Sequence, residues 1–176
     1  DMLTLGREAA GRDTRVTRTY WLPGEDPAVA PADMIDFEQL LSADASEPSP
    51  TLDSRMPAQI IYTSGTESLP KGAILTHEAV CWEYVSCVVE GEISATDTLL
   101  HALPLYHCAQ LDVFLGPAIY VGASSVITGK PTPDSILPLL ARHRINSFFA
   151  PPSIWIALMR APAFDTTDLS ALRKGY

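Results

Sequence analysis

Short apolar runs alternate with helical patterns from Gln59 to the end of the chain, and this alternation limits the fold more than any other feature. The apolar runs predict strands at residues 59–63, 98–103, 124–128 and 145–150. A helical pattern follows each of them, over residues 76–90 and 109–121, from residue 132 onward, and over residues 151–161. This repeat predicts the α/β class, with a largely parallel β-sheet and helices on both of its faces.

Several helix ends carry specific signals. Thr76 can cap a helix that runs to about Glu90, and Gly91 stands where a helix end favours glycine. The apolar face of this helix is expected to contain Cys81, Tyr84, Val85 and Val88. Further along, Gly116-Pro117 predicts a bend in the helix over residues 109–121.

The first 57 residues do not follow this repeat. Residues 14–21 are rich in strand-forming types and predict one peripheral strand. Between Pro23 and Pro57 the chain has six prolines, and eight acidic residues against the single base Arg55. A short helix is predicted at residues 34–41. Because such a segment buries little surface, we expect a peripheral strand and an acidic, Pro-rich connection over 1–57, and an α/β subdomain over 58–176 that is truncated at its C-terminal end.

Composition narrows the function classes. A chain of 176 residues with 47% hydrophobic content is long enough for a core. The net charge of −9 argues against nucleic-acid binding. Asp112 interrupts the best candidate for a transmembrane segment, and the first residues lack the pattern of a secretory signal. We therefore expect no transmembrane segment and a cytoplasmic location.

The three cysteines, Cys81, Cys87 and Cys108, are an odd number and form no C-x-x-C pair. This pattern supports neither a disulfide framework nor a zinc site. We expect reduced and mostly buried thiols.

The stretch YTSGTESLPKG at residues 62–72 follows the first predicted strand. At the carboxyl edge of a parallel sheet, where open α/β sheets bind ligands, its backbone N–H groups would form an anion cradle. Lys71 would add the mobile positive charge that a polyphosphate needs. A Walker P-loop is excluded, because Pro70, Lys71 and Gly72 stand where that motif requires Gly-Lys-Ser/Thr. The composition alone fits both a phosphate-binding loop and a plain surface turn.

The same stretch resembles the phosphate-binding signature of the acyl-adenylate-forming enzymes, whose usual form is YTSGTTGxPKG. This superfamily contains acyl-CoA synthetases, luciferases and peptide-synthetase adenylation domains. The similarity continues in order through ILTHEAV (74–80), LPLYHCAQLD (103–112), GASSVI (122–127), FFAPPSIWIALM (148–159) and DLSALRKGY (168–176). The resemblance implies that residues 58–176 form the phosphate-loop part of the large N-terminal domain of such an enzyme, most like a fatty-acyl-CoA synthetase.

The resemblance implies a two-step ligase that uses ATP, Mg²⁺ and coenzyme A. A carboxylic acid, expected to be a fatty acid, and ATP would give an acyl-adenylate and pyrophosphate, and coenzyme A would then take the acyl group. Lys71 would act as the catalytic residue by neutralising charge on the leaving pyrophosphate. The residues implied to hold the nucleotide are Thr63, Ser64, Gly65, Thr66, Glu67, Ser68 and Lys71. The residues implied to border the acid are Tyr106, His107 and Gln110.

Two positions depart from the usual signature, because Glu67 replaces a threonine and Ser68 replaces a glycine. A carboxylate beside phosphate is repulsive unless a cation lies between them or the side chain points away. We therefore expect Glu67 either to help hold Mg²⁺ or to face solvent, and no residue is assigned as a definite metal ligand. His101, inside a predicted strand, is expected to be structural, and Lys130 to be an ordinary surface lysine.

The later motifs of the superfamily do not occur in these 176 residues. We therefore expect the chain alone to be inactive and to work with the rest of its parent polypeptide. Two alternatives stay open: a non-catalytic nucleotide-binding fragment, and an amino-acid-activating adenylation domain.

Overall fold

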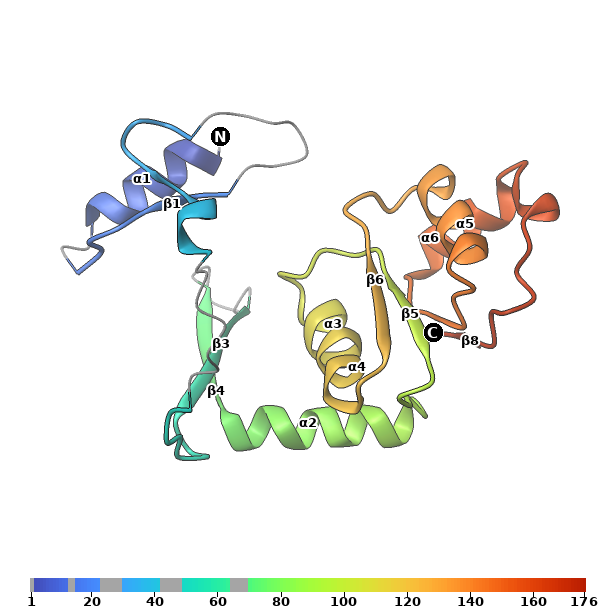
Figure 1. Ribbon diagram of the computed structural model, residues 1–176, viewed down its shortest axis with the longest axis horizontal. Coiled ribbons are helices and arrows are strands. Elements are labelled where there is room, and N and C mark those ends of the chain that lie inside the picture. Colours follow the sequence, from blue (N-terminus) through green and yellow to red (C-terminus); the bar gives the residue numbers. More distant parts are fainter. Residues whose placement is uncertain (1, 13–14, 23–29, 42–48, 64–69) are drawn as a thin grey trace. The chain divides into compact units, whose positions relative to one another are not determined.

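The computed structural model describes residues 2–12, 15–22, 30–41, 49–63 and 70–176. The chain divides into two compact units, Asp1–Pro50 and Thr51–Tyr176. Figure 1 shows the elements of each unit along the chain. In the described part, no helix combines the length and the apolar character that crossing a bilayer demands.

The first unit contains helix α1 (Met2–Arg12), strands β1 (Tyr20–Trp21) and β2 (Ile35–Asp36), and the 3-10 helix η1 (Phe37–Leu40). The two strands pair in parallel over two residues each. The strand predicted over residues 14–21 is therefore confirmed only at its end, where a partner strand exists. The helix predicted over residues 34–41 is confirmed only as η1, which Asp36 caps by accepting a hydrogen bond from the Glu38 N–H at 3.0 Å. Helix α1 was not expected.

The second unit contains a four-stranded parallel sheet. Its strands are β5 (Thr98–His101), β6 (Ser124–Ile127), β7 (Ser147–Phe148) and β8 (Lys174–Gly175), in the order β6-β5-β7-β8. All three neighbouring pairs are parallel. Leu99, Leu100 and His101 are buried, as expected for a central strand covered on both faces. The predicted α/β class is confirmed.

Helices cover both faces of this sheet (Figure 1). One side carries a helical run of α3 (Cys108–Gln110), the π-helical turn η2 (Leu111–Leu115) and α4 (Gly116–Val121). Helix α2 (His77–Glu90) packs against η2 and α4 of this run. The other side carries α5 (Pro133–Arg142) and α6 (Pro152–Arg160), after which the 3-10 helix η3 (Phe164–Thr166) leads to β8. The main core cluster consists of Leu100, Ala102, Ile136, Leu137, Leu140, Ile145, Phe148, Ala150 and Leu158.

The predicted helix start at Thr76 is confirmed, because its side chain accepts a hydrogen bond from the Ala79 N–H at 3.2 Å. The helix predicted over residues 109–121 is present as the run Cys108–Val121, and its π turn ends immediately before Gly116-Pro117. Pro117 has no N–H to donate to the preceding turn. A β-carbon at Gly116 would lie 2.3 Å from Cζ of Tyr84, so glycine lets this run approach α2.

The strand predicted at residues 59–63 exists, but the expectation that it is a buried member of the parallel sheet is wrong. It is β3 (Pro57–Thr63), and it pairs antiparallel with β4 (Lys71–Thr76) in a separate two-stranded sheet. Ile60 is 55% exposed and Tyr62 is 71% exposed. The physical reason is the short connection over residues 64–69, which lets the apolar residues 73–75 return beside β3 as a hairpin.

All three cysteines are free, but the expectation that they are mostly buried is wrong. Cys81 and Cys108 are exposed, and Cys87 is half-buried. Helix α2 packs through the row that contains buried Val80 and Tyr84. Because Cys81 lies one position beyond Val80, its side chain falls outside that row.

Candidate active site

The strand order places a topological switch point between β5 and β7. The chain leaves β5 for β6 on one side and then crosses through α5 to β7 on the other side. Connections that diverge in this way leave a crevice at the carboxyl ends of the two strands, where open α/β sheets bind ligands. A pocket of about 300 Å³ lies there, lined by Leu103, Pro104, Tyr106, His107, Ala109, Gln110, Phe149 and Pro151.

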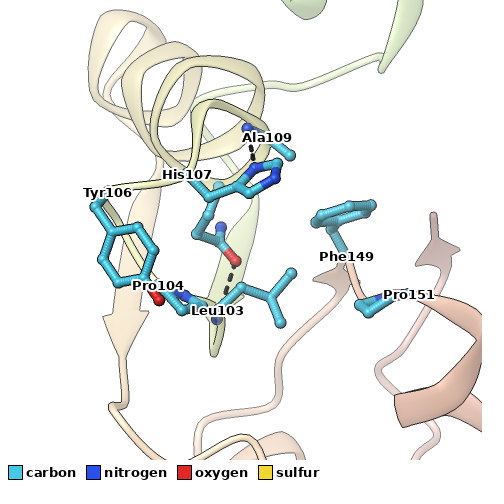
Figure 2. Close-up of a pocket in the computed structure, with 8 residues that line it drawn as sticks. Leu103, Pro104, Tyr106, His107, Ala109, Phe149 and Pro151 are labelled. Carbon is cyan, nitrogen blue, oxygen red and sulfur yellow. Dashed lines mark hydrogen bonds between the residues drawn. The ribbon is translucent and has the colours of Figure 1, made fainter. Parts of the chain in front are cut away.

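The pocket has mainly apolar walls from two connections. Figure 2 shows His107 on one side and Phe149 with Pro151 on the other, whereas the Tyr106 ring points to the far side of its loop. Tyr106 is 91% exposed. Phe149 stacks on Phe114 with ring centroids 4.5 Å apart. The pocket wall at Phe149 therefore packs against the helical run, which contains Phe114. The pocket suits an apolar group that has one polar end.

His107 provides a polar group of this pocket and caps the helical run. Its Nδ1 accepts a hydrogen bond from the Ala109 N–H at 3.2 Å (Figure 2). An Nδ1 that accepts leaves Nε2 as the ring nitrogen available to a ligand. The position of His107 on the connection after β5 follows from the sequence, and its capping role is new from the structure.

Gln110 forms the floor of the pocket and is fully buried. Its Oε1 accepts from the Leu103 N–H at 3.3 Å, and its Nε2 lies 2.7 Å from Nδ1 of His101. Since the Leu103 N–H can only donate, it fixes the orientation of the amide, and Nε2 must donate to His101. The side-chain amide of Gln110 therefore has partners on both of its ends.

This orientation also fixes the tautomer of His101. Because its Nδ1 accepts from Gln110, its proton lies on Nε2, which donates to Oγ of Ser125 at 3.1 Å. Burial lowers the pKa of His101 from its ordinary value of 6.5 to about 4, so the ring is neutral at pH 7. The expectation that His101 is structural is confirmed, since it joins β5, β6 and the helical run.

The β3–β4 hairpin carries the described part of the predicted phosphate-binding loop. Thr63 ends β3 and lies opposite Lys71, the first residue of β4. The Thr63 hydroxyl donates to the carbonyl oxygen of Lys71 at 3.5 Å, and both residues are exposed. The other predicted nucleotide-binding residues, Ser64, Gly65, Thr66, Glu67 and Ser68, lie outside the described residues.

A second pocket of about 370 Å³ lies between β3 and residues 105–112. Its lining residues are Gln59, Ile60, Ile61, Tyr62, Leu105, Tyr106, Cys108, Leu111 and Asp112. Tyr106 borders both pockets, so the space beside the hairpin adjoins the space at the switch point.

Within the described ranges, no group of three or more His, Cys, Asp or Glu side chains could hold a metal ion.

Sequence reasoning did not assign Phe149 or Asp112 to the site. Phe149 follows the two ladder residues of β7, and the rule that ligands bind at carboxyl strand ends could have found it. For Asp112 the only signal was a charge within an apolar helical run.

Comparison with known proteins places the chain in a family. The family model described as AMP-binding enzyme matches residues 6–176. Indoleacetate–CoA ligase of Aromatoleum aromaticum is 34% identical over 145 residues, which are 81% of this chain and 28% of that protein. The chain therefore spans less than a third of the length of this relative.

Solved structures agree with the family match. ATP-bound MatB from Rhodopseudomonas palustris has a TM-score of 0.65 and 28% identity, covering 74% of this chain and 25% of that one. The inhibitor-bound N-terminal domain of FACL13 from Mycobacterium tuberculosis has a TM-score of 0.72 and 28% identity, covering 82% and 37%. The chain belongs to the AMP-binding enzyme family, and its fold is similar to part of the N-terminal domain of FACL13.

Proposed function

We propose that the protein containing this chain activates a carboxylic acid with ATP and transfers the acyl group to coenzyme A. A carboxylate oxygen attacks the α-phosphorus of ATP, and the bond to the β-phosphate breaks, which gives an acyl-adenylate and pyrophosphate. The thiol of coenzyme A then displaces AMP. The observation that carries this proposal is the apolar pocket at the switch point, bordered by His107, in a chain of the AMP-binding family.

In this proposal, the nucleotide binds at the β3–β4 hairpin. Thr63 and the following residues, Ser64, Gly65, Thr66, Glu67 and Ser68, would offer backbone N–H groups and hydroxyls to the phosphates. Lys71, which lies opposite Thr63, would stabilise the negative charge that grows on the leaving pyrophosphate. That role needs a cation near the phosphates and no covalent step.

Mg²⁺ fits this arrangement as a partner of the nucleotide. It usually keeps several waters and binds one or two carboxylates together with substrate phosphates, so a cluster of protein ligands is not required. Glu67, outside the described residues, is the candidate carboxylate. When bound, the ion would neutralise phosphate charge during formation of the adenylate.

The acid proposed for the pocket is apolar. Leu103, Phe149 and Pro151 offer apolar walls, and His107 would contact the carboxylate of the acid. The resemblance in sequence favours a fatty acid, whereas the relative that is 34% identical is a ligase for indoleacetate, an aromatic acid. We propose an acid with an aromatic or aliphatic apolar body.

Exposed thiols at Cys81 and Cys108 suit a reducing compartment such as the cytoplasm.

The test is acid-dependent exchange between ATP and labelled pyrophosphate, catalysed by the full-length protein. Aromatic acids, fatty acids of several lengths and amino acids are offered separately. The proposal predicts exchange with at least one apolar acid, followed by formation of its CoA thioester. Exchange with amino acids alone would instead indicate an amino-acid-activating domain, and no exchange with any acid would leave only a nucleotide-binding role.

A further inference from the structure

Asp112 is a buried carboxylate that faces the hairpin. It lies in the π turn η2 and is 1% exposed. The side-chain amide of Gln59, on β3, donates to its Oδ1 at 3.0 Å and to its Oδ2 at 3.2 Å. Because the two residues are 53 positions apart in sequence, this contact joins the hairpin to the helical run.

Packing alone does not explain a carboxylate at this position. Burying a charge costs several kcal/mol unless strong partners compensate for it, and the nearby Phe114 and Leu115 are buried apolar residues. Glu83 of α2 adds a like charge: burial, and then the charge of Asp112, raise the pKa of the Glu83 carboxyl. A leucine at position 112 would avoid both costs, which favours a role for Asp112 in placing the hairpin.

Residues 110–112 are attached to both sheets of the second unit. Gln110 binds His101 on β5, in the parallel sheet, and the Leu103 N–H just after that strand. Two residues later, Asp112 binds Gln59 in the antiparallel hairpin. The segment that forms the pocket floor therefore also holds the hairpin.

The hairpin needs such an attachment. A two-stranded antiparallel sheet is at best marginally stable by itself, and its apolar residues Ile60 and Ile74 are 55% and 61% exposed. Gln59 precedes Thr63 by four residues on β3, which corresponds to about 13 Å along an extended strand. Thr63 in turn lies opposite Lys71.

We propose that Asp112 is a positioning residue that, through Gln59, holds the β3–β4 hairpin so that Thr63 and Lys71 lie correctly relative to the pocket at His107. This inference rests on the proposed function. Asp112 acts through Gln59 and needs no contact with the nucleotide. A directional hydrogen bond fixes the position of β3 along the helical run, whereas an apolar contact would allow β3 to slide.

The test compares Asp112→Leu, Asp112→Asn and Gln59→Leu in the full-length protein, with exposed Asp165→Leu as the control. Asp112→Leu should raise the KM for ATP by about tenfold, because small displacements of a binding group are costly, and leave the KM for the acid within about twofold. Asp112→Asn keeps an acceptor for Gln59 and should restore the KM for ATP. The double variant Gln59→Leu/Asp112→Leu should be no worse than Asp112→Leu, because both changes remove one contact.

A second readout does not depend on catalysis. Hydrogen exchange of the amides in β3 and β4 should be about tenfold faster in Asp112→Leu than in the wild type, with the amides of β5 unchanged. Unchanged exchange in the hairpin, or an unchanged KM for ATP in an active enzyme, would overturn the inference. A wild-type protein that shows no acid-dependent exchange of pyrophosphate would instead overturn the proposed function.

Discussion

The side-chain amide of Gln110 donates to Nδ1 of His101 over 2.7 Å while its oxygen accepts from the Leu103 N–H. These two partners of Gln110 lie at the carboxyl end of β5, since His101 is the last residue of that strand and Leu103 follows it by two positions. The contact explains how a polar side chain can be fully buried at the floor of an apolar pocket.

Gln110→Leu should destabilise the protein because it leaves Nδ1 of the buried His101 and the N–H of the half-buried Leu103 without their partners. Each unsatisfied group costs about 1–3 kcal/mol, so the free energy of unfolding should fall by at least that amount. Chemical denaturation measures this change. Gln39→Leu, at an exposed position in η1, is the matched control and should change the free energy by less than about 0.5 kcal/mol. Equal stability of the two variants would contradict the network.

The buried His101 should make stability depend on pH. Its pKa is about 4 in the folded protein and has an ordinary value of 6.5, so the unfolded chain binds the proton more readily. The contribution of the neutral ring is complete above pH 6.5, falls as the pH drops from 6.5 to 4, and changes no further below 4, for a total of roughly 3 kcal/mol. Denaturation at several pH values measures it.

The test of this pH effect compares how steeply the free energy of unfolding changes with pH in each variant, and not its absolute value. His101→Gln should have a flatter dependence of the free energy of unfolding on pH between 6.5 and 4.5 than the wild type. His143→Gln, at an exposed histidine, is the control variant. If His101→Gln and the wild type show the same slope, His101 is not the neutral buried group described above.

Gly116→Ala should disturb the packing of the helical run on α2. The added β-carbon would lie 2.3 Å from Cζ of Tyr84, and relief requires movement of that ring or of the helix. Overpacking of this kind costs about 1–3 kcal/mol, measurable as a lower melting temperature. Gly6→Ala in α1 meets nothing within 4 Å and should be neutral or stabilising. The effect at position 116 should shrink in a Tyr84→Leu background.

His107 caps the start of the helical run and is also proposed to contact the acid. Two variants separate these roles. Asparagine is a good N-cap, so His107→Asn should keep stability but lower kcat/KM for the acid by about tenfold or more. His107→Ala should lose the same activity and also about 1 kcal/mol of stability. Kinetics with the preferred acid and thermal unfolding of both variants test this. Wild-type kinetics in His107→Asn would remove the imidazole from the site.

Local sequence signals predicted the helices of the second unit well and the first strand of that unit poorly. The cap at Thr76 depends on residues that are neighbours in sequence, and it is present. Periodicity also located β5, β6 and β7. It could not tell whether residues 59–63 pair in parallel with β5 or antiparallel with residues 71–76, because an apolar run has the same pattern in both cases.

The candidate site was only partly visible in the sequence. His107 and Gln110 could be placed near the sheet edge because they follow β5 closely. The wall at Phe149 and the contact between Gln59 and Asp112 arise from residues far apart in the chain, and no local pattern reports such contacts. The partner of Asp112 became visible only with the fold.

We propose that Lys71 stabilises the negative charge on the pyrophosphate that leaves ATP, and one measurement tests this role directly. Acid-dependent exchange of pyrophosphate into ATP is measured for full-length wild type, Lys71→Ala and Lys130→Ala, together with the unfolding midpoint of each. The account predicts that Lys71→Ala exchanges about 100-fold more slowly, as for the loss of one electrostatic stabiliser, with an unchanged midpoint, and that Lys130→Ala matches the wild type. An exchange rate in Lys71→Ala equal to that of the wild type would contradict it.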